Sequence, residues 1–459
     1  MKILKQPSEN INKLCEEQEI TGGIHYRPFI YVSLTEVDGT LLACNRFTGC
    51  LAAVSPDEAE ILRNGTDNAS SAAELIKYGF LVPEEHDDYQ YCVDTRELLK
   101  IFSPPSKTKS YVIMTTLDCN ARCFYCYQMG RNRNRSAMTL DTAKAVAEYI
   151  IKTSKGCDVR IQWYGGEPLM NTEVIDSICD ALALAGVNYK SSMISNGFLV
   201  TEELVKKAVE LWKLKNIQIP LDGTEEPYNR IKAYVNIGGI SAYYVVMNSI
   251  DMLLKHSIRV VVRVNLDNHN KEDIFKLADE LAARFGENKE FSLYSDVLYE
   301  NAGTKKPQRL SAERLELVNS LVEFENYCEK IGINVPAKLS SGIKMFRCMA
   351  DSGNSVVISP QGELGLCDHA MESHIFGSVF SDDKNKELID SWKKVFNSKD
   401  TCSKCPNYPD CVRLVNCPDD GPLLCDAAYK TKMFHRHKQA VVKEYRKHIS
   451  NQAGEANGI

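Results

Sequence analysis

The sequence predicts an α/β fold in three parts: a small N-terminal unit, a central open or closed barrel of alternating strands and helices, and a cysteine-rich C-terminal unit. Three observations support this prediction. The chain has 459 residues, 44% of them hydrophobic, which is enough for about three domains with cores. Apolar, strand-like runs alternate with amphipathic stretches from residue 111 to 294. Ten of the 17 cysteines lie in two clusters, one near residue 120 and one near the C-terminus.

Residues 1–101 form the predicted N-terminal unit. Apolar runs between residues 29 and 44 favour a small sheet, and two short helices are expected to follow it. Ser55 and Ser70 are the expected N-caps of these helices, and Gly65 and Gly79 their expected ends. The segment FSPPSKTKS at 102–110 combines two prolines with serine and lysine, and it predicts a linker.

Residues 111–309 are predicted to form the barrel. Its expected strands are 111–116, 159–164, 191–195, 217–221, 259–265 and 291–294. Helical stretches such as 140–154 and 201–215 lie between them, so the strands should be parallel with right-handed crossovers. In such folds the functional groups collect just past the carboxyl ends of the strands. Distinctive residues follow the strand ends in this way: Cys119, GGEP at 165–168, SNG at 195–197, Asp222 and Asn265.

Composition limits the classes of function. The N-terminus has no apolar signal segment, and no run approaches the roughly 18 apolar residues of a membrane helix. We therefore expect a cytoplasmic protein with no membrane partner. The net charge of −6 argues against a nucleic acid partner. Cysteines in a reducing compartment seldom form a disulfide framework, so their clusters indicate metal or redox chemistry.

The first cluster places three thiols within eight residues, at Cys119, Cys123 and Cys126. They can turn onto one metal centre but leave it one protein ligand short. A structural zinc site is normally closed by four ligands. The spacing therefore predicts an iron centre with an open position for a small-molecule ligand.

This cysteine loop, with GGEP one strand later, resembles the radical S-adenosylmethionine (radical SAM) enzymes. The resemblance implies a partial (β/α)6 TIM-like barrel in which Cys119, Cys123 and Cys126 hold a [4Fe-4S] cluster. The fourth iron would bind S-adenosylmethionine, and one electron would cleave it to methionine and a 5′-deoxyadenosyl radical that abstracts a hydrogen atom from the substrate. Adjacent glycines in GGEP allow a close approach of the backbone.

The same resemblance implies a set of residues that contact S-adenosylmethionine: Tyr125, Gly165, Gly166, Glu167, Ser195, Asn196, Asp222, Arg230 and Arg263. Surface or structural roles stay open for Arg230 and Arg263.

Seven cysteines lie between residues 348 and 425. A zinc ribbon would need four of them. The pattern resembles the SPASM domain, expected here at 347–434, which carries two auxiliary [4Fe-4S] clusters and makes three in the whole chain. The resemblance implies one set for the second auxiliary cluster, Cys402, Cys405, Cys411 and Cys425, and one for the first, Cys348, Cys367 and Cys417.

Two features depart from the SPASM pattern. Five residues separate Cys411 from Cys417 where the family usually has three, and no eighth cysteine lies between Cys348 and Cys367. The first departure weakens the assignment of Cys417. The second predicts a first auxiliary cluster with an open iron. Asp368 occupies the position of a proposed general base in a related subgroup, with a loop aspartate as the alternative.

The resemblance extends to peptide maturases of the ranthipeptide and sactipeptide type. It implies that the radical takes a hydrogen from a carbon of a ribosomally made precursor, that a cysteine sulfur joins this carbon as a thioether, and that a cluster accepts the remaining electron. Residues 1–101 resemble the winged-helix-like domain that binds a leader peptide as an added strand, with a structural cap on the barrel as the alternative. An external donor such as flavodoxin or ferredoxin would supply electrons.

Other hypotheses remain open. The same machinery could form a carbon–carbon crosslink, an epimerised residue or formylglycine. A different class is a non-catalytic iron–sulfur electron carrier or a zinc-binding interaction module. The remaining segments are a bridging region at 310–346, with a helix at 310–332, and a basic, then polar, frayed tail at 435–459.

Overall fold

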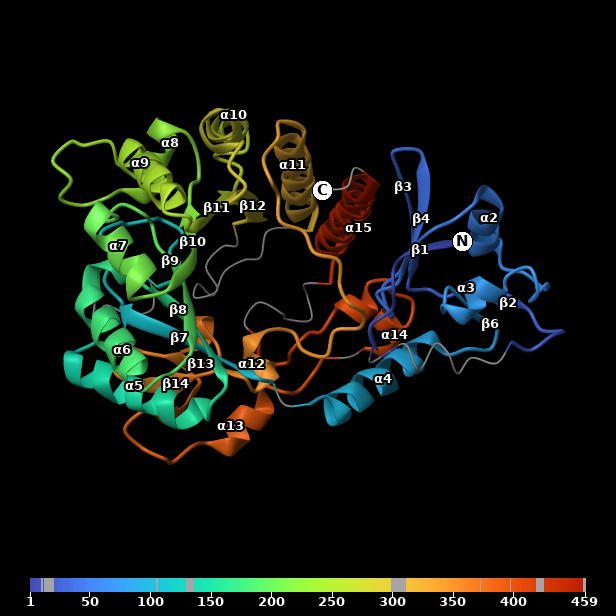
Figure 1. Ribbon diagram of the computed structural model, residues 1–459, viewed down its shortest axis with the longest axis horizontal. Coiled ribbons are helices and arrows are strands. Elements are labelled where there is room, and N and C mark those ends of the chain that lie inside the picture. Colours follow the sequence, from blue (N-terminus) through green and yellow to red (C-terminus); the bar gives the residue numbers. More distant parts are fainter. Residues whose placement is uncertain are drawn as a thin grey trace.

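The computed structural model describes residues 1–9, 11, 20–104, 106–128, 136–298, 311–371, 373–396, 398–417 and 425–456. Figure 1 shows a large sheet with its helices on one side of the molecule and the N-terminal unit on the other, with C-terminal segments between them. The boundary predicted between residues 309 and 310 lies outside the described residues.

Six parallel strands form the centre of the fold, in the order in which they occur in the chain. They are β7 (Thr108–Thr116), β8 (Asp158–Gly165), β9 (Tyr189–Ile194), β10 (Leu214–Pro220), β11 (Arg259–Leu266) and β12 (Phe291–Val297). All six expected strands are therefore confirmed. Each neighbouring pair is separated in the chain by at least one helix, as right-handed crossovers require.

The helices of this region are α5 (Leu140–Ser154), α6 (Thr172–Leu184), α7 (Glu202–Glu210), α8 (Glu225–Lys232), α9 (Ala242–Lys255) and α10 (Asp273–Phe285). They lie outside the sheet in Figure 1. Their apolar faces pack on alternate strand residues such as Ile113, Trp163 and Val262, which are fully buried. The helix expected at 201–215 ends at Glu210, because Leu214 begins the next strand.

The cysteine-rich part extends the same sheet. Strand β13 (Ser355–Ile358) pairs in parallel with β7, and β14 (Glu363–Gly365) and β15 (Ile375–Ser378) continue from it in antiparallel order. Gly362 turns the β13–β14 hairpin at φ +81°, a conformation that favours glycine. The sequence analysis predicts this part as a separate unit, whereas the structure joins it to the central sheet. The pairing could not be predicted, because sheet pairing between distant segments leaves no local pattern in the sequence.

The N-terminal unit holds a four-stranded antiparallel sheet in the order β1 (Lys2–Lys5), β5 (Leu51–Ala53), β4 (Thr40–Asn45) and β3 (Val32–Val37). Strands β2 (Tyr26–Pro28) and β6 (Leu81–Pro83) form a second pair. Helix α2 (Pro56–Asn64) starts at Ser55, which with Glu58 makes a capping box, and is followed by Gly65, as expected. Helix α3 (Ala73–Lys77) follows Ala72 and not the expected cap Ser70.

Helix α4 (Asp88–Phe102) leads from the N-terminal unit toward the sheet. It runs one residue into the predicted linker, and β7 starts at Thr108. The short segment η1 (Pro168–Asn171) precedes α6 in the central region. The short helical segments of the C-terminal part are α12 (Met349–Ser352), η2 (Asp368–Ala370), α13 (Lys386–Ser391), α14 (Lys399–Cys402) and η3 (Tyr408–Asp410).

Two long helices join the parts. Helix α11 (Ser311–Lys330) agrees with the expected bridging helix. Helix α15 (Ala427–Ala456) takes the place of the frayed tail expected at 435–459 as far as Ala456, and residues 457–459 lie outside the described residues. It packs along α11 and against β3, and its Val441 is fully buried against the N-terminal sheet. Basic and apolar residues alternate along this segment, which is the pattern of a helix with one buried face. The prediction of a frayed tail was therefore wrong for the residues of α15.

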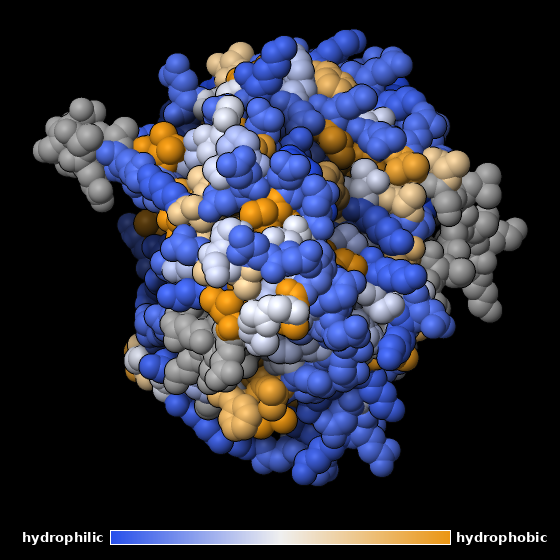
Figure 2. Space-filling view, turned by 90° about the vertical axis from the view of Figure 1, so that its right-hand side faces the viewer, coloured by the Kyte–Doolittle hydropathy of each residue, from blue (hydrophilic) through white to orange (hydrophobic). Residues whose placement is uncertain are grey.

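No helix among the described segments is both long and apolar enough to span a bilayer. The face that carries the N-terminal unit is mostly hydrophilic, with hydrophobic residues in small separate groups (Figure 2).

The docking of α15 predicts a pH-dependent stability. His437 is 8% exposed, its Nε2 lies 2.9 Å from Ser33 Oγ, and burial and the charge of Arg46 lower the pKa of His437 to about 3. As the pH falls below about 6.5, the unfolded chain takes up a proton that folded His437 does not, so stability is lost. From pH 6.5 to 5 this one group should remove about 1.5 kcal/mol.

Chemical denaturation at both pH values measures this loss. His437→Gln should reduce the loss by about 1.5 kcal/mol. The control variant is His25→Gln, which changes a partly exposed histidine of the N-terminal unit. Equal losses in wild type and His437→Gln would contradict the docking of α15.

Candidate functional site

The three thiols of the first cluster lie in the loop that follows β7. The backbone N–H of Cys119 donates to Asp118 Oδ1 at 2.8 Å, and the N–H of Cys126 donates to Cys123 O at 3.1 Å. Burial, with smaller contributions from the charges of Glu167, Cys123 and Cys126, raises the pKa of Cys119 to about 12. Three partly buried thiols near one another become stable thiolates only beside a strong positive charge, such as a metal centre.

The two glycines of GGEP bring the end of β8 against this loop. A Cβ at Gly165 would lie 2.2 Å from Thr116 O, and one at Gly166 would lie 2.0 Å from Asp118 O. The N–H of Gly166 donates to Thr116 O at 2.8 Å, and that of Glu167 donates to Asp118 O at 2.8 Å. The close approach predicted from the sequence is therefore present, and it is made to the chain's own backbone.

Glu167 is fully buried, and its carboxylate joins β8 to the end of β9. Oε1 accepts hydrogen bonds from Ser195 Oγ at 2.8 Å and Leu169 N at 3.1 Å, and Oε2 accepts one from Asn196 N at 2.8 Å. Burial raises the pKa of Glu167 to about 7, although these hydrogen bonds oppose the increase. Both oxygens are thus occupied by protein donors.

Asn196 continues this connection to the cysteine loop. Its Nδ2 donates to Asn120 Oδ1 at 2.7 Å and lies 3.8 Å from Cys119 Sγ. Ser195 and Asn196 are 3% and 9% exposed. Three residues predicted to contact S-adenosylmethionine, Glu167, Ser195 and Asn196, therefore meet one another and position the loop that carries the thiols.

Asp222 and Tyr125 belong to a second buried network, centred on Lys232. Lys232 Nζ donates to Asp222 Oδ2 and to Tyr125 Oη, each at 2.6 Å, and the Tyr125 hydroxyl also donates to Asp222. Asn265 adds its N–H and its Nδ2, both 2.9 Å from Asp222 Oδ1. Lys232 O accepts from the N–H of Arg122 at 2.8 Å, so α8 is fixed to the cysteine loop.

Lys232 is 1% exposed and was not predicted. Burial opposes the charges of this pair, but Lys232 lowers the pKa of Asp222 below its usual value, and Asp222 raises the pKa of Lys232. A lysine on a polar helix normally indicates a solvated face, so the sequence offers no local signal for its burial.

The two predicted arginines lie apart. Arg230 is exposed on α8 and pairs with Glu226 at 3.2 Å. Arg263 is partly buried on β11, with Nε lacking a hydrogen-bond partner. Burial opposes its charge, but the neighbouring Tyr294, Asp296 and Asp222 raise the pKa of Arg263.

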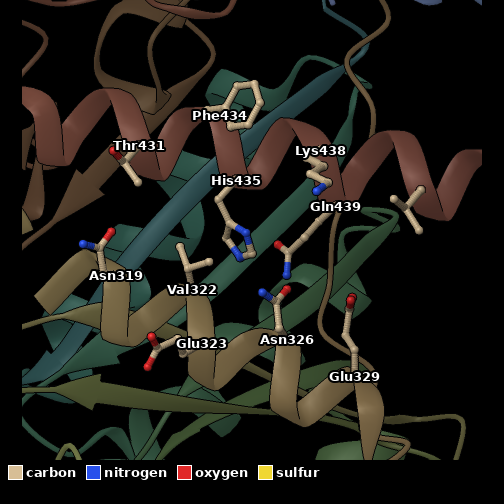
Figure 3. Close-up of a pocket in the computed structure, with 11 residues that line it drawn as sticks. Asn319, Val322, Glu323, Asn326, Glu329, Thr431, Phe434, His435, Lys438 and Gln439 are labelled. Carbon is tan, nitrogen blue, oxygen red and sulfur yellow. The ribbon is translucent and has the colours of Figure 1, made fainter. Parts of the chain in front are cut away.

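Two cavities border the cysteine loop. One of about 430 Å³ is lined by Phe124, Tyr125, Asp222, Arg230, Ile231, Asn265, Asp267, His269, Asn270 and Leu298. Another, of about 260 Å³, lies between β7 and the β13–β15 hairpin and includes Tyr127, Gln128, Asp368 and Met371. A cavity of about 460 Å³ between α11 and α15 contains none of the predicted site residues (Figure 3).

Asp368 meets the cysteine loop in the 260 Å³ cavity. Tyr127, the residue after Cys126, donates from Oη to Asp368 Oδ2 at 3.3 Å and lies 2.7 Å from Tyr164 Oη. The ring of His369 packs on that of Tyr127, with centroids 4.4 Å apart. Tyr127 and Tyr164 were not predicted as site residues. Each lies next to a motif, the cysteine loop or GGEP, without being one of the residues that define it.

The C-terminal thiols fall into two groups. Burial, followed by the charges of Asp368, Cys417 and Cys348, raises the pKa of Cys367 to about 12. Burial raises the pKa of Cys411, with contributions from Cys405 and Cys425, and burial raises that of Cys405, with contributions from Cys425 and Cys402. These charges link Cys367 with Cys348 and Cys417, and link Cys405 and Cys411 with Cys425. The two ligand sets stay predictions.

In the described part of the chain, no three Cys, His, Asp or Glu side chains converge closely enough to hold one metal ion. The donors of all three predicted sets are thiols, which is the donor type of iron–sulfur clusters. On donor chemistry, the residues fit such clusters.

Comparison with known families matches residues 113–281 to the Radical SAM superfamily. The chain is 26% identical to the Methanocaldococcus jannaschii protein MJ0907 over 61% of its own length and 90% of that protein. It is 23% identical to a serine-type anaerobic sulfatase-maturating enzyme of Klebsiella aerogenes, over 59% of its length and 69% of that enzyme.

A solved structure, native anSMEcpe with bound AdoMet and Cp18Cys peptide, superposes with a TM-score of 0.55 at 16% identity. The superposition covers 75% of this chain and 99% of that one. At this identity the match shows a shared fold.

The Lys232–Asp222 pair gives a prediction about stability. Lys232→Met leaves a buried carboxylate without its cation, so the free energy of unfolding should fall by about 3–5 kcal/mol. The double variant Asp222→Asn/Lys232→Met should lose less, because no charge is left unpaired. Urea denaturation measures both values.

The matched control is Arg230→Met on the same helix, which breaks an exposed ion pair and should change stability by less than about 1 kcal/mol. A Lys232→Met variant as stable as this control would show that the buried network does not stabilise the fold.

Proposed function

We propose, on the premise that residues 113–281 form a radical SAM superfamily domain, that this protein cleaves S-adenosylmethionine to a 5′-deoxyadenosyl radical and installs thioether crosslinks in a ribosomally made precursor peptide. The observation that carries the proposal is the loop after β7: three thiols, fixed to the ends of β8 and β9 by Glu167 and Asn196, between two cavities. The carboxyl ends of barrel strands are where such folds place their chemistry.

Cys119, Cys123 and Cys126 would hold a [4Fe-4S] cluster. When bound, that cluster supplies the electron that cleaves S-adenosylmethionine into methionine and the radical. The chain's own contribution is to fix the loop: Asn196 Nδ2 lies 3.8 Å from Cys119 Sγ and the Ala121 N–H lies 3.4 Å from it. Such hydrogen bonds to sulfur stabilise the thiolate and tune the cluster.

The 430 Å³ cavity is the proposed site of S-adenosylmethionine. Arg230 lies at its edge and has a guanidinium that suits the methionine carboxylate. His269 and the side-chain oxygen of Asn265, whose N–H and Nδ2 are engaged with Asp222, offer polar groups, and the exposed ring of Phe124 offers a surface for the adenine base. Asp222 and Tyr125 line the cavity, but their polar atoms are engaged with Lys232. Their proposed role is to hold the wall of the cavity in place.

The 260 Å³ cavity is the proposed place of the reacting peptide residues. Asp368 Oδ2, oriented by Tyr127, is the proposed acceptor of the proton of a substrate thiol. Cys348, Cys367 and Cys417 would hold the first auxiliary cluster, with one position left for the sulfur of the substrate. Cys402, Cys405, Cys411 and Cys425 would hold the second.

The N-terminal unit is the proposed binding site of a leader peptide. Strands β1 and β3 are the edges of its four-stranded sheet, and an added strand would pair with a free edge. Part of β3 is covered, since Ser33 contacts His437 of α15. Electrons would come from an external donor such as flavodoxin or ferredoxin.

Formylglycine formation is the second candidate, favoured by the similarity to a sulfatase-maturating enzyme. Mass spectrometry of the modified peptide separates the two functions when combined with chemical labelling. A thioether removes two hydrogens and one alkylatable thiol, whereas formylglycine creates an aldehyde that reacts with hydrazides. A peptide that gains an aldehyde would replace the thioether proposal with this one.

Replacing Cys119, Cys123 and Cys126 together by Ala should abolish release of 5′-deoxyadenosine from S-adenosylmethionine. Iron and acid-labile sulfide per chain, after anaerobic reconstitution, should fall from about twelve to about eight, because one of three four-iron clusters is lost. Cys157→Ala, a thiol outside all three sets, is the control and should change neither value. Cleavage that persists in the triple variant would overturn the proposal.

Asp368→Asn should slow formation of the crosslink by about 100-fold or more, the usual contribution of a general base, while 5′-deoxyadenosine is still released. The ratio of 5′-deoxyadenosine to crosslinked peptide, measured by chromatography, should therefore rise. The control is Asp382→Asn, which changes an exposed aspartate of the C-terminal part. Asp351→Asn would not serve as a control, because Asp351 belongs to a capping box. A crosslinking rate unchanged by Asp368→Asn would exclude Asp368 as the base.

A further inference from the structure

The N-terminal unit packs directly on the segment that carries Cys402, Cys405 and Cys411. Cys402 and Cys405 contact a hydrophobic cluster of the N-terminal unit that includes Phe47 and Tyr89. The rings of Tyr89 and Tyr408 lie 4.9 Å apart. The Ile343 N–H donates to Phe47 O at 2.8 Å, and a Cβ at Gly49 would lie 2.6 Å from the backbone of Ser341. This contact has no room for a layer of water.

Helix α4 contributes a buried arginine to this contact. Arg96 is 2% exposed. Its Nε donates to Lys344 O at 2.9 Å, and its Nη2 donates to Tyr408 O at 2.8 Å and lies 3.4 Å from Cys411 O. The guanidinium also lies over the Tyr408 ring, 4.7 Å from its centroid. Arg96 therefore binds the backbone of the segment that presents Cys411.

A second buried arginine follows β4. Arg46 is 3% exposed, and its Nη1 donates to Asn407 Oδ1 at 2.8 Å and lies 3.5 Å from Asp410 Oδ2. The charges of Arg46 and Asp410 therefore compensate each other in part. The charge of Arg96 differs, because no described carboxylate forms an ion pair with it.

A buried cation without a counter-charge is costly. The carboxylate of Asp410 is paired with Arg46, and burial raises the pKa of Cys92, one turn earlier on α4. Arg96 lies 3.4 Å from Cys411 O, and the four thiolates of Cys402, Cys405, Cys411 and Cys425 around an iron–sulfur cluster would leave a net negative centre. The positive charge of Arg96 beside such a cluster would favour the reduced, more negative state of the cluster. The reason is that a cluster's reduction potential depends on the net charge and the hydrogen bonds around it.

We propose that Arg96 is the counter-charge of the second auxiliary cluster, so that the unit expected to bind the peptide leader is also part of this cluster site. The inference rests on the proposed function for the presence of the cluster. Arg96 is a positioning residue: it holds the backbone of the cysteine segment and raises the reduction potential of the cluster. Arg46 holds the neighbouring turn through Asn407 and Asp410.

The test uses the full chain with Cys119, Cys123 and Cys126 replaced by Ala, so that only the C-terminal clusters remain. Iron, sulfide and midpoint potentials, followed by electron paramagnetic resonance, are measured in this background and after adding Cys402→Ala. Loss of about four of eight irons on adding Cys402→Ala identifies the second cluster. If Cys402→Ala changes neither iron nor spectrum, the cluster assignment in the proposed function fails, and the inference fails with it.

With the cluster identified, Arg96→Gln should make its reduction at least tenfold less favourable, a decrease of about 59 mV for one electron. Arg96→Lys keeps the charge and should stay within a few-fold of the parent. Arg63→Gln, an exposed arginine of the same unit, should leave the potential unchanged.

Loss of about four irons in Arg96→Gln, with full iron in Arg96→Lys, would also support the counter-charge, because charge alone then retains the cluster. Full iron with an unchanged potential in Arg96→Gln would overturn the inference. Loss of iron in both Arg96 variants would overturn the role of the charge, since the guanidinium would then act only through its hydrogen bonds.

Discussion

The buried carboxylate of Glu167 connects the ends of three neighbouring strands, and the candidate site depends on this connection. Its backbone N–H meets Asp118 after β7, its own position follows β8, and its oxygens accept from Ser195 and Asn196 after β9. Such a carboxylate must be fully hydrogen-bonded to be tolerated in the interior. The cysteine loop is thereby fixed to rigid elements, and a site on rigid elements holds its groups in one geometry.

Buried charge recurs at two of the three predicted cluster sites. Lys232 and Asp222 are paired beside the first cysteine loop, and Arg96 and Arg46 lie beside the Cys402–Cys411 segment. In each case a cation on a helix or turn is held by oxygen atoms from a segment that carries thiols. Low exposure strengthens these interactions, so they fix the backbone around the thiols and set the local electrostatic potential at the same time.

The three parts of the chain are continuous in space. Strand β13 adds the cysteine-rich part to the central sheet beside β7, and α15 spans from α11 to the N-terminal sheet. The cavity next to Asp368 exists only because the three antiparallel strands β13, β14 and β15 lie beside the cysteine loop. The arrangement therefore places Asp368 and the cysteine loop on the walls of one cavity.

Local features of the chain could be predicted from its sequence. Periodicity placed all six central strands, and Ser55 as an N-cap placed α2. The cysteine spacing marked the loop after β7 and the C-terminal segment as the two thiol-rich parts of the chain. Only the tertiary structure decided which polar residues face a cavity and which face one another. Glu167, Ser195 and Asn196 proved to be internally bonded, Lys232 and Arg96 proved to be buried, and the expected tail proved to be a packed helix. The physical reason is that periodicity and spacing act within a few residues of the chain, whereas the burial of a charge depends on partners such as Asp222 and Cys411, which are brought near only by the packing of distant segments.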